Sequence, residues 1–477
     1  MRRPLLIALS LTTALTASLA VAGPSSAAAA ERPVIDFNGD GFADLAVSAP
    51  GGTVAGTAEA GYISVSYGGS GGVGAGGRVL LTQDSPGVPG DVTENGSFGF
   101  DTTVADFDGD GYTDLAAAGQ LGSVILWGSA DGLGAGVALA GSPDTLESGD
   151  FNGDGHADLV TDVFPENEEG TIGMTIQYGP LSRAGVPSRS DVIATSDADG
   201  SGTYDFVVGD INGDGADEII TSHGFEEMAH NGKLWTGGAN GTSHTSKKVT
   251  SFQNGVIGDV NGDGFGDFVF RDTGDVWEGD DYGAGNVTVT YGSAAGLSTR
   301  TKVITQDSPG VPGVGESEDG STNFGGDQFG YDLAAGDMTG DGIDDIAVGV
   351  PGEDIGSGSA AKKDAGSVVL LKGAASGLSG TGATAFNQST ADVPGASETE
   401  DYFGARVLLL DVNNNNRADL AVAAINEDGA QQDSGAFWLF RGSKNGPVTT
   451  NIASFGPAAL GATESKYGRL GYELGGR

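Results

Sequence analysis

Acidic residues in this chain recur in short clusters that share one spacing. Seven segments follow or approach the pattern D-x-(D/N)-x-(D/N)-G-x-x-D, with oxygen-bearing side chains at positions 1, 3, 5 and 9. In a tightly curled loop such side chains point to a common centre, and a backbone carbonyl at position 7 can join them. Hard cations such as Ca²⁺ take six to eight oxygen ligands, whereas Mg²⁺ keeps its waters and demands octahedral geometry. The pattern therefore predicts a set of calcium sites.

The expected ligands are positions 1, 3, 5, 7 and 9 of each loop, with the carbonyl oxygen acting at position 7. Numbered as loops 1 to 7 along the chain, they are Asp36, Asn38, Asp40, Phe42 and Asp44; Asp106, Asp108, Asp110, Tyr112 and Asp114; Asp150, Asn152, Asp154, His156 and Asp158; Asp210, Asn212, Asp214, Ala216 and Glu218; Asp259, Asn261, Asp263, Phe265 and Asp267; Asp337, Thr339, Asp341, Ile343 and Asp345; and Asp411, Asn413, Asn415, Arg417 and Asp419.

The seven loops are not equal in their ligands. Loop 2 has four aspartates and is expected to bind most tightly, whereas loop 6 has the weaker ligand Thr339 at position 3. In loop 4, Glu218 follows Asp217, which can shift the register. Loop 7 has Asn415 and Asn416 in place of Asp and Gly and is expected to be the weakest. A lone segment of this kind can also be an Asp-Gly hairpin turn. Six of the seven keep glycine at positions 4 and 6, which predicts about five to seven bound Ca²⁺ ions.

Composition excludes several kinds of chemistry. The 477 residues include 65 acidic and 22 basic residues, a formal net charge of −43, so no basic surface is expected to bind nucleic acid. The absence of cysteine excludes disulfides, thiolate metal sites and cysteine nucleophiles. The four histidines are scattered, so a histidine-based catalytic centre is not expected. No catalytic constellation is found, and the chain is not expected to be an enzyme.

The loops recur 44 to 78 residues apart, and each leads into a short apolar run and a second β-like run. Repetition on this scale indicates a propeller or solenoid, and no segment has helical periodicity. Phe-Gly dipeptides begin eight residues before three of the loops, at Phe98, Phe329 and Phe403. A similar Tyr467-Gly468 has no loop behind it. We therefore expect an all-β, seven-bladed β-propeller of four-stranded antiparallel blades, closed by a C-terminal strand that pairs into the N-terminal blade. An open array of small calcium modules is the alternative.

The first 30 residues resemble an export signal. Arg2 and Arg3 precede an apolar stretch that ends in small residues, with A-x-A sites before residues 23 and 31. A transmembrane anchor is the alternative interpretation. We expect residues 1–30 to be a secretory signal peptide and residues 31–477 to form one extracellular, monomeric domain without a membrane span.

The Phe-Gly dipeptides, the acidic loops and exits such as Ala49-Pro50-Gly51 resemble the FG-GAP repeat of integrin α subunits and of secreted bacterial relatives. The resemblance covers essentially all of residues 31–477, although loops 3 to 5 lack a clear Phe-Gly. It implies a seven-bladed propeller with seven calcium-loop repeats on one face and a partner on the opposite face.

Two features bear on that opposite face. The long connections there include 271–285, 352–366 and 426–435, and loops on rigid scaffolds often carry function. The phrase Gln-Asp-Ser-Pro-Gly-Val-Pro-Gly occurs at both 83–90 and 306–313, which predicts a shared loop conformation. We expect a secreted calcium-binding module for adhesion to an extracellular protein or glycan. The alternatives are an extracellular hydrolase-associated protein, phospholipase D-like or glycan-acting, with its site on this face, and a purely structural surface protein.

Overall fold

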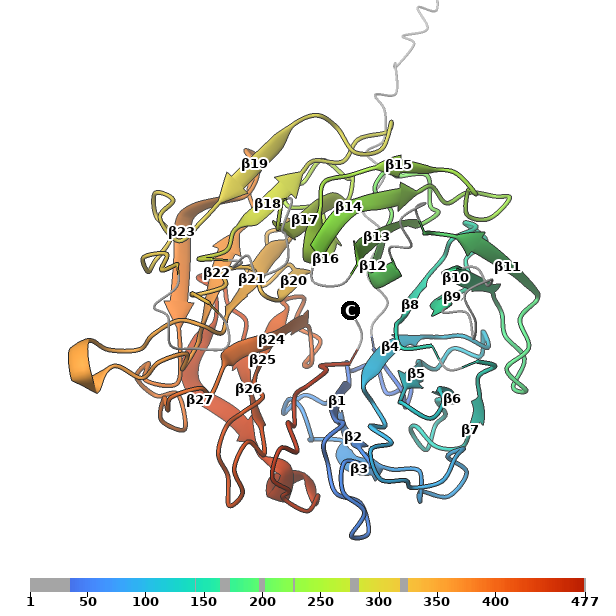
Figure 1. Cartoon of the computed structure of the whole chain (residues 1–477), viewed down its shortest axis with the longest axis horizontal. Coiled ribbons are helices and arrows are strands. Elements are labelled where there is room, and N and C mark those ends of the chain that lie inside the picture. The colour runs from blue at the N-terminus through green and yellow to red at the C-terminus, as the bar shows by residue number, and fades with distance from the viewer. Residues whose placement is uncertain are drawn as a thin grey trace, which may run out of the picture.

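Seven antiparallel β-sheets stand side by side around a common centre in the computed structural model (Figure 1). The structure describes residues 35–141, 143–163, 172–196, 202–225, 228–274, 283–317 and 325–475. The expected signal peptide, residues 1–30, lies outside these ranges. No helix in the described part of the chain has the length and apolar character needed to span a membrane.

Each sheet is a simple meander whose strands follow one another from the centre to the rim. The first blade contains β1 (Leu45–Ala49), β2 (Tyr62–Tyr67) and β3 (Gly77–Leu81). The other six are β4 (Asp101–Ala105), β5 (Asp114–Ala118), β6 (Val124–Leu126) and β7 (Gly136–Ala138); β8 (Leu146–Gly149), β9 (Asp158–Val163), β10 (Gly173–Tyr178) and β11 (Arg189–Ala194); β12 (Gly202–Gly209), β13 (Glu218–Phe225), β14 (Met228–Trp235) and β15 (Ser246–Lys248); β16 (Phe252–Gly258), β17 (Asp267–Asp272), β18 (Val287–Thr290) and β19 (Thr301–Ile304); β20 (Leu333–Gly336), β21 (Asp345–Val350), β22 (Ser367–Lys372) and β23 (Ser379–Phe386); and β24 (Phe403–Leu410), β25 (Asp419–Ala424), β26 (Ala436–Arg441) and β27 (Val448–Phe455). Two short 3₁₀ helices, η1 (Gly358–Ala360) and η2 (Pro457–Leu460), lie in connections.

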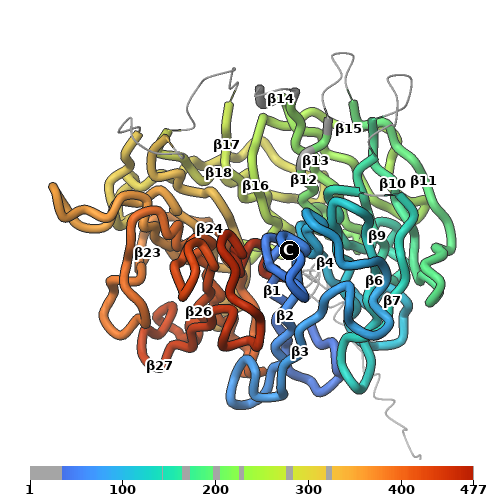
Figure 2. The backbone as a smooth tube through the Cα atoms, turned by 60° about the horizontal axis from the view of Figure 1, so that its bottom comes forward, coloured from blue at the N-terminus to red at the C-terminus, as the bar shows by residue number. Residues whose placement is uncertain are grey.

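The acidic loops all lie at one end of the blades. In six blades the loop joins the innermost strand to the second strand, and its position 9 is the first residue of that second strand. Loop 1 enters β1 directly after Asp44. Because a meander alternates its connections between two ends, the connections β21–β22, β25–β26 and β19–β20 lie at the opposite end, as the sequence predicts (Figure 2).

The hydrophobic core is divided among the junctions between blades. Seven buried clusters each combine residues of two neighbouring sheets, in the described part of the chain. One of them joins the last blade to the first, with Leu45 and Val47 of β1 packed against Leu408 and Leu410 of β24. The apolar faces therefore close into a ring, which is the packing of a seven-bladed propeller and not of an open array.

Closure by a C-terminal strand is not shown. Among the described residues the first sheet has three strands, and the C-terminal segment forms an isolated antiparallel bridge between Val47 and Leu474. Three backbone hydrogen bonds accompany the bridge: Ser48 N–H to Glu473 C=O at 2.9 Å, Gly475 N–H to Ala46 C=O at 2.7 Å, and Gly471 N–H to Ser48 C=O at 2.9 Å. The segment lies beside β1 as expected, but it is too irregular to be a strand.

The Phe-Gly equivalent of this segment is Leu470-Gly471, so the assignment to Tyr467-Gly468 is wrong. Leu470 forms a parallel bridge with Gly435, as Phe403 does with Gly366. Gly471 has φ +94°, close to the +93° of Gly404. Leu470 is fully buried, whereas Tyr467 is 44% exposed. Leucine fills the pocket that phenylalanine occupies elsewhere, and this hid the correct register.

Candidate metal centre

All seven loops are curled by the same internal hydrogen bond. The position-6 N–H donates to Oδ2 of the position-1 aspartate at 2.6–3.0 Å in every loop. In loops 1 to 6 the position-7 N–H also donates to Oδ1 of the position-5 aspartate at 3.0–3.2 Å. Loop 7, with Asn415 at position 5, has no such bond among those described. Position 6 needs φ of about +83° to +92° in the loops that carry glycine there, which glycine adopts without strain.

The position-9 carboxylate fixes each loop to its blade. Its side chain is 0% exposed in six loops and 2% exposed at Glu218. In all loops except loop 4 it accepts an N–H from the glycine that follows the next strand outward, at 2.7–3.1 Å. A Cβ on Gly128, one of these glycines, would lie 2.2 Å from the Thr113 carbonyl oxygen. The recurring glycine after the outer β-like run is therefore required by close backbone approach.

Burial changes the acidity of the position-9 groups. It raises the pKa to about 7 at Asp44, Asp114, Asp158, Glu218 and Asp267, against the opposing effect of the backbone N–H donors. The pKa is raised to about 6 at Asp345 and Asp419 for the same reason. Negative neighbours in the same loop add to the shift at all seven sites, and at Asp419 the positive charge of Arg441 also opposes it. A cation at the loop centre would reverse the effect, because an opposite charge favours the ionised form.

Loop 2 brings its carboxylates closest together. One oxygen each of Asp106, Asp108 and Asp114 lies within 4.8 Å of the others, the one such group among the described residues. This acidic cluster could hold a metal ion. The fourth predicted ligand, Asp110, is not part of the group and instead forms an ion pair with Arg183. Arg183 also reaches the cluster itself, with Nε 2.5 Å from Oδ2 of Asp108.

Two individual residues, Glu218 of loop 4 and Thr339 of loop 6, can be placed in the structure. Glu218 takes position 9 without a shift of register, since its two oxygens accept the Ile211 N–H at 3.0 Å and the Asn212 amide at 2.7 Å. Asp217 turns to the neighbouring blade and accepts the Asp150 N–H at 2.7 Å. In loop 6 the Thr339 hydroxyl is buried without a hydrogen-bond partner in the described structure. A buried hydroxyl oxygen at a ligand position fits an oxygen-binding cation.

Neighbouring loops are connected to one another. At five junctions the position-8 N–H donates to the position-1 carbonyl of the preceding loop, at 2.8–3.1 Å; the donors are Thr113, Asp217, Gly266, Asp344 and Ala418. The position-7 side chain lies over the position-4 glycine of the preceding loop. A Cβ on Gly39 would lie 2.6 Å from Tyr112, and one on Gly340 would lie 2.2 Å from Arg417. The role of the position-7 side chain is thus packing between loops.

Comparisons with known proteins agree with this architecture. The sequence profile of the FG-GAP repeat matches residues 33–66 and 329–371, and that of the FG-GAP-like repeat matches residues 106–161. The chain is an FG-GAP repeat protein. Integrin alpha-PS2 of Drosophila melanogaster is 32% identical over 124 residues, which are 26% of this FG-GAP chain and 8% of the integrin. The matched part is therefore a small fraction of that relative.

Solved structures with low identity were also found for this FG-GAP protein. An Agrocybe aegerita lectin described as recognising non-reducing terminal N-acetylglucosamine has a TM-score of 0.49 at 13% identity, over 90% of this chain and 94% of the lectin. A neuraminidase-like protein of A/flat-faced bat/Peru has a TM-score of 0.36 at 12% identity, over 76% and 87% of the two chains. Neither likeness bears on the ligand of this chain.

Proposed function

We propose that this FG-GAP protein is a secreted, calcium-stabilised propeller that serves as a binding or adhesion module. The observation that carries the proposal is the common geometry of the seven loops, which turn the predicted ligand positions to one end of the ring. The all-oxygen donor set suits Ca²⁺. Side chains at positions 1, 3, 5 and 9 would hold the ion, together with the carbonyl at position 7, and about five to seven ions would be bound.

Calcium in this arrangement would supply stability. Extracellular sites bind with dissociation constants of roughly 10⁻⁴–10⁻³ M. A site at about tenfold excess over its dissociation constant stabilises the folded state by ~1.4 kcal/mol. Several such sites together are comparable with the margin of ~5–15 kcal/mol by which a domain is folded. Calcium would also neutralise part of the repulsion within a chain of net charge −43.

A partner would bind at the end opposite the loops. The connections at that end, β3–β4, β19–β20, β21–β22 and β25–β26, vary in length, whereas the acidic loops at the other end are uniform. An extracellular protein or glycan is the expected partner, and the export signal at residues 1–30 would deliver the chain to it.

Thermal unfolding of residues 31–477 in chelator and in millimolar calcium, with the metal counted on the same sample, tests the calcium role. A large calcium-dependent rise of the melting temperature with five to seven ions per chain is expected. No shift and no bound metal would refute it. Binding is tested on a glycan array and a panel of immobilised matrix proteins, with and without calcium. A folded, calcium-loaded chain that binds none of these probes would contradict the adhesion role.

A further inference from the structure

Two further groups of carboxylates lie at the end of the propeller opposite the acidic loops. Each combines residues from a connection between blades and residues from the connection after a second strand. The Gln306 cluster contains Gln306, Glu316, Asp327, Glu353 and Asp354, and the Gln388 cluster contains Gln388, Glu398, Asp401, Glu427 and Asp428. None of these residues belongs to the seven loops.

The two clusters repeat the same contacts. Gln306 Nε2 donates to Glu353 Oε2 at 2.6 Å, and Gln388 Nε2 donates to Glu427 Oε2 at 2.6 Å. In each cluster a buried aspartate accepts a backbone N–H from a glutamate: Glu316 N–H to Asp327 at 2.7 Å in the first, and Glu398 N–H to Asp401 at 2.5 Å in the second. Two independent copies of one polar arrangement indicate a built site.

The glutamine amides point to a missing ligand. Gln306 and Gln388 are 3% and 2% exposed, and the Oε1 atom of each is buried without a hydrogen-bond donor in the described structure. Because Nε2 of the same amide contacts the glutamate, Oε1 is held within the cluster. A buried carbonyl oxygen left without a partner destabilises the fold, unless a cation or water binds it.

The carboxylates carry the charge that a cation would neutralise. Burial raises the pKa of Asp327 to about 7, that of Asp401 to about 8 and that of Glu427 to about 7, and neighbouring carboxylates of the same cluster add to each shift.

We propose that each cluster binds one divalent cation, Ca²⁺, through the glutamine Oε1 and the surrounding carboxylates. Oxygen-only ligands of this kind, amide carbonyl plus carboxylates, are those that Ca²⁺ takes. The carboxylates are not drawn as close together as those of loop 2, so their side chains would rotate around the bound ion. Each ion would tie a connection between blades to the blade beside it.

The first blade provides an internal comparison. Gln83 has the same place as Gln306, since Gly90 and Gly313 both approach the glutamine amide. The Gly61 N–H donates to the Gly52 carbonyl as the Gly435 N–H donates to the Glu427 carbonyl. Gly52 therefore takes the place that glutamate has in the two blades with clusters. This blade lacks the glutamate that contacts the glutamine amide and is expected to bind no ion at this end.

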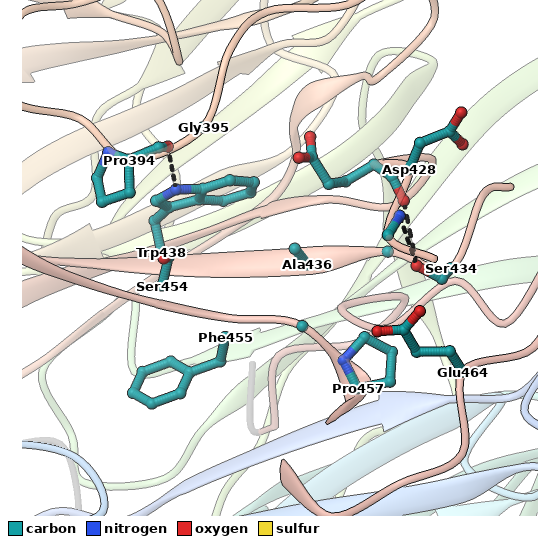
Figure 3. Close-up of a pocket in the computed structure, with 14 residues that line it drawn as sticks. Pro394, Gly395, Asp428, Ser434, Ala436, Trp438, Ser454, Phe455, Pro457 and Glu464 are labelled. Carbon is teal, nitrogen blue, oxygen red and sulfur yellow. Dashed lines mark hydrogen bonds between the residues drawn. The ribbon is translucent and has the colours of Figure 1, made fainter. Parts of the chain in front are cut away.

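Trp438 makes the Gln388 cluster measurable. Its indole lines a cavity of about 180 Å³ together with Glu427 and Asp428 (Figure 3). A methyl group on Gly395 would lie 3.4 Å from Gln388 Nε2 and 3.6 Å from Trp438 Cζ2, so amide and indole are neighbours. Tb³⁺ bound in the cluster would therefore be sensitised by excitation of Trp438.

The experiment titrates residues 31–477 with Tb³⁺ under tryptophan excitation, displaces Tb³⁺ with Ca²⁺, and counts Ca²⁺ per chain. The isosteric double variant D401N/E427Q is expected to bind one Ca²⁺ fewer and to lose the Trp438-sensitised emission. W438F, which keeps the ligands, is expected to lose that emission at an unchanged ion count. D110N, in loop 2, serves as the control at the other end and is expected to retain the Trp438 signal.

An unchanged ion count in D401N/E427Q would overturn the proposal and leave a proton-sharing carboxyl cluster. Unchanged emission in W438F would overturn it as well, and this variant does not depend on the double variant folding. Calcium binding at the acidic loops is tested separately, by the effect of D110N on the number of bound Ca²⁺ ions. The outcome for the cluster is thus distinguishable from the outcome for the acidic loops.

Discussion

Replacing Arg183 by alanine is expected to strengthen cation binding at loop 2. The guanidinium of Arg183 lies against Asp108 and Asp110, two of the predicted ligands. Arg183 belongs to the connection between β10 and β11 of the third blade. Its positive charge lies against carboxylates that would otherwise be free to bind a metal ion. A metal ion that uses these carboxylates must first release it, so the arginine competes with the ion.

The size of the effect follows from the exposure of the pairs. The Arg183 side chain is 51% exposed, and those of Asp108 and Asp110 are 5% and 33% exposed. Ion pairs open to solvent contribute ~0.2–1 kcal/mol each, so two of them contribute ~1 kcal/mol after allowance for screening. That free energy corresponds to a roughly fivefold lower dissociation constant for Ca²⁺ in R183A. The pKa of Asp108 agrees with a modest contribution, because burial raises it although Arg183 opposes the shift.

The assay is a calcium titration followed by the fluorescence of Trp127, whose ring centroid lies 5.5 Å from the Arg183 guanidinium carbon. The matched control R183K keeps one positive charge but not the two-pronged contact, and it is expected to fall between wild type and R183A. The difference should shrink at high salt. If R183A bound calcium with unchanged or weaker affinity, the guanidinium would be a support of the loop and not a competitor.

Three further outcomes are expected. In chelator the melting temperature should fall as the pH rises from about 5 to about 8, because folding stabilises the protonated form of the position-9 carboxyls, whose pKa values are raised to about 6–7; in saturating calcium, which holds these groups ionised in the folded state, the melting temperature should change little over this range, and parallel curves would contradict this. L470A should cost ~2–5 kcal/mol in the free energy of unfolding, whereas Y467A should cost under ~0.5 kcal/mol, measured by urea denaturation; equal costs would reject the corrected register. G128A should destabilise by ~1–3 kcal/mol because its Cβ meets the Thr113 carbonyl at 2.2 Å, whereas G134A, with open space around it, should be near neutral in the same assay.

Most of the fold could be predicted from local patterns in the sequence. The acidic loops, the strand after each loop and the number of blades could all be predicted, because each depends on residues close together in the chain. The shared conformation of the two Gln-Asp-Ser-Pro-Gly phrases is confirmed by equivalent hydrogen bonds, Thr82 N–H to Ser85 Oγ and Thr305 N–H to Ser308 Oγ.

Features that depend on contacts between blades were missed. Arg183 is 73 residues from Asp110, and nothing in its local sequence marks it as a partner of loop 2. The carboxylates of the Gln388 cluster come from two connections, β23–β24 and β25–β26, and the hairpin of β24 and β25 lies between them in the sequence. Leu470 was missed for a different reason, since only its backbone conformation, and not its residue type, matches the other blades. The one sequence signal for the clusters was a repeated pattern, in which a glutamine is followed farther along the chain by a Glu-Asp pair.

The packing of each position-7 side chain over the glycine of the preceding loop has an evolutionary consequence. A duplicated blade carries both its own position-7 residue and its own position-4 glycine, so it can be inserted into the ring with both surfaces already matched. A point mutation at position 4 of loop 1 or loop 6 has no such compensation, because φ of +70° to +72° and the overlying side chain of Tyr112 or Arg417 both oppose a larger residue. Gain or loss of a whole blade is therefore expected to disturb the ring less than replacement of either of these two glycines.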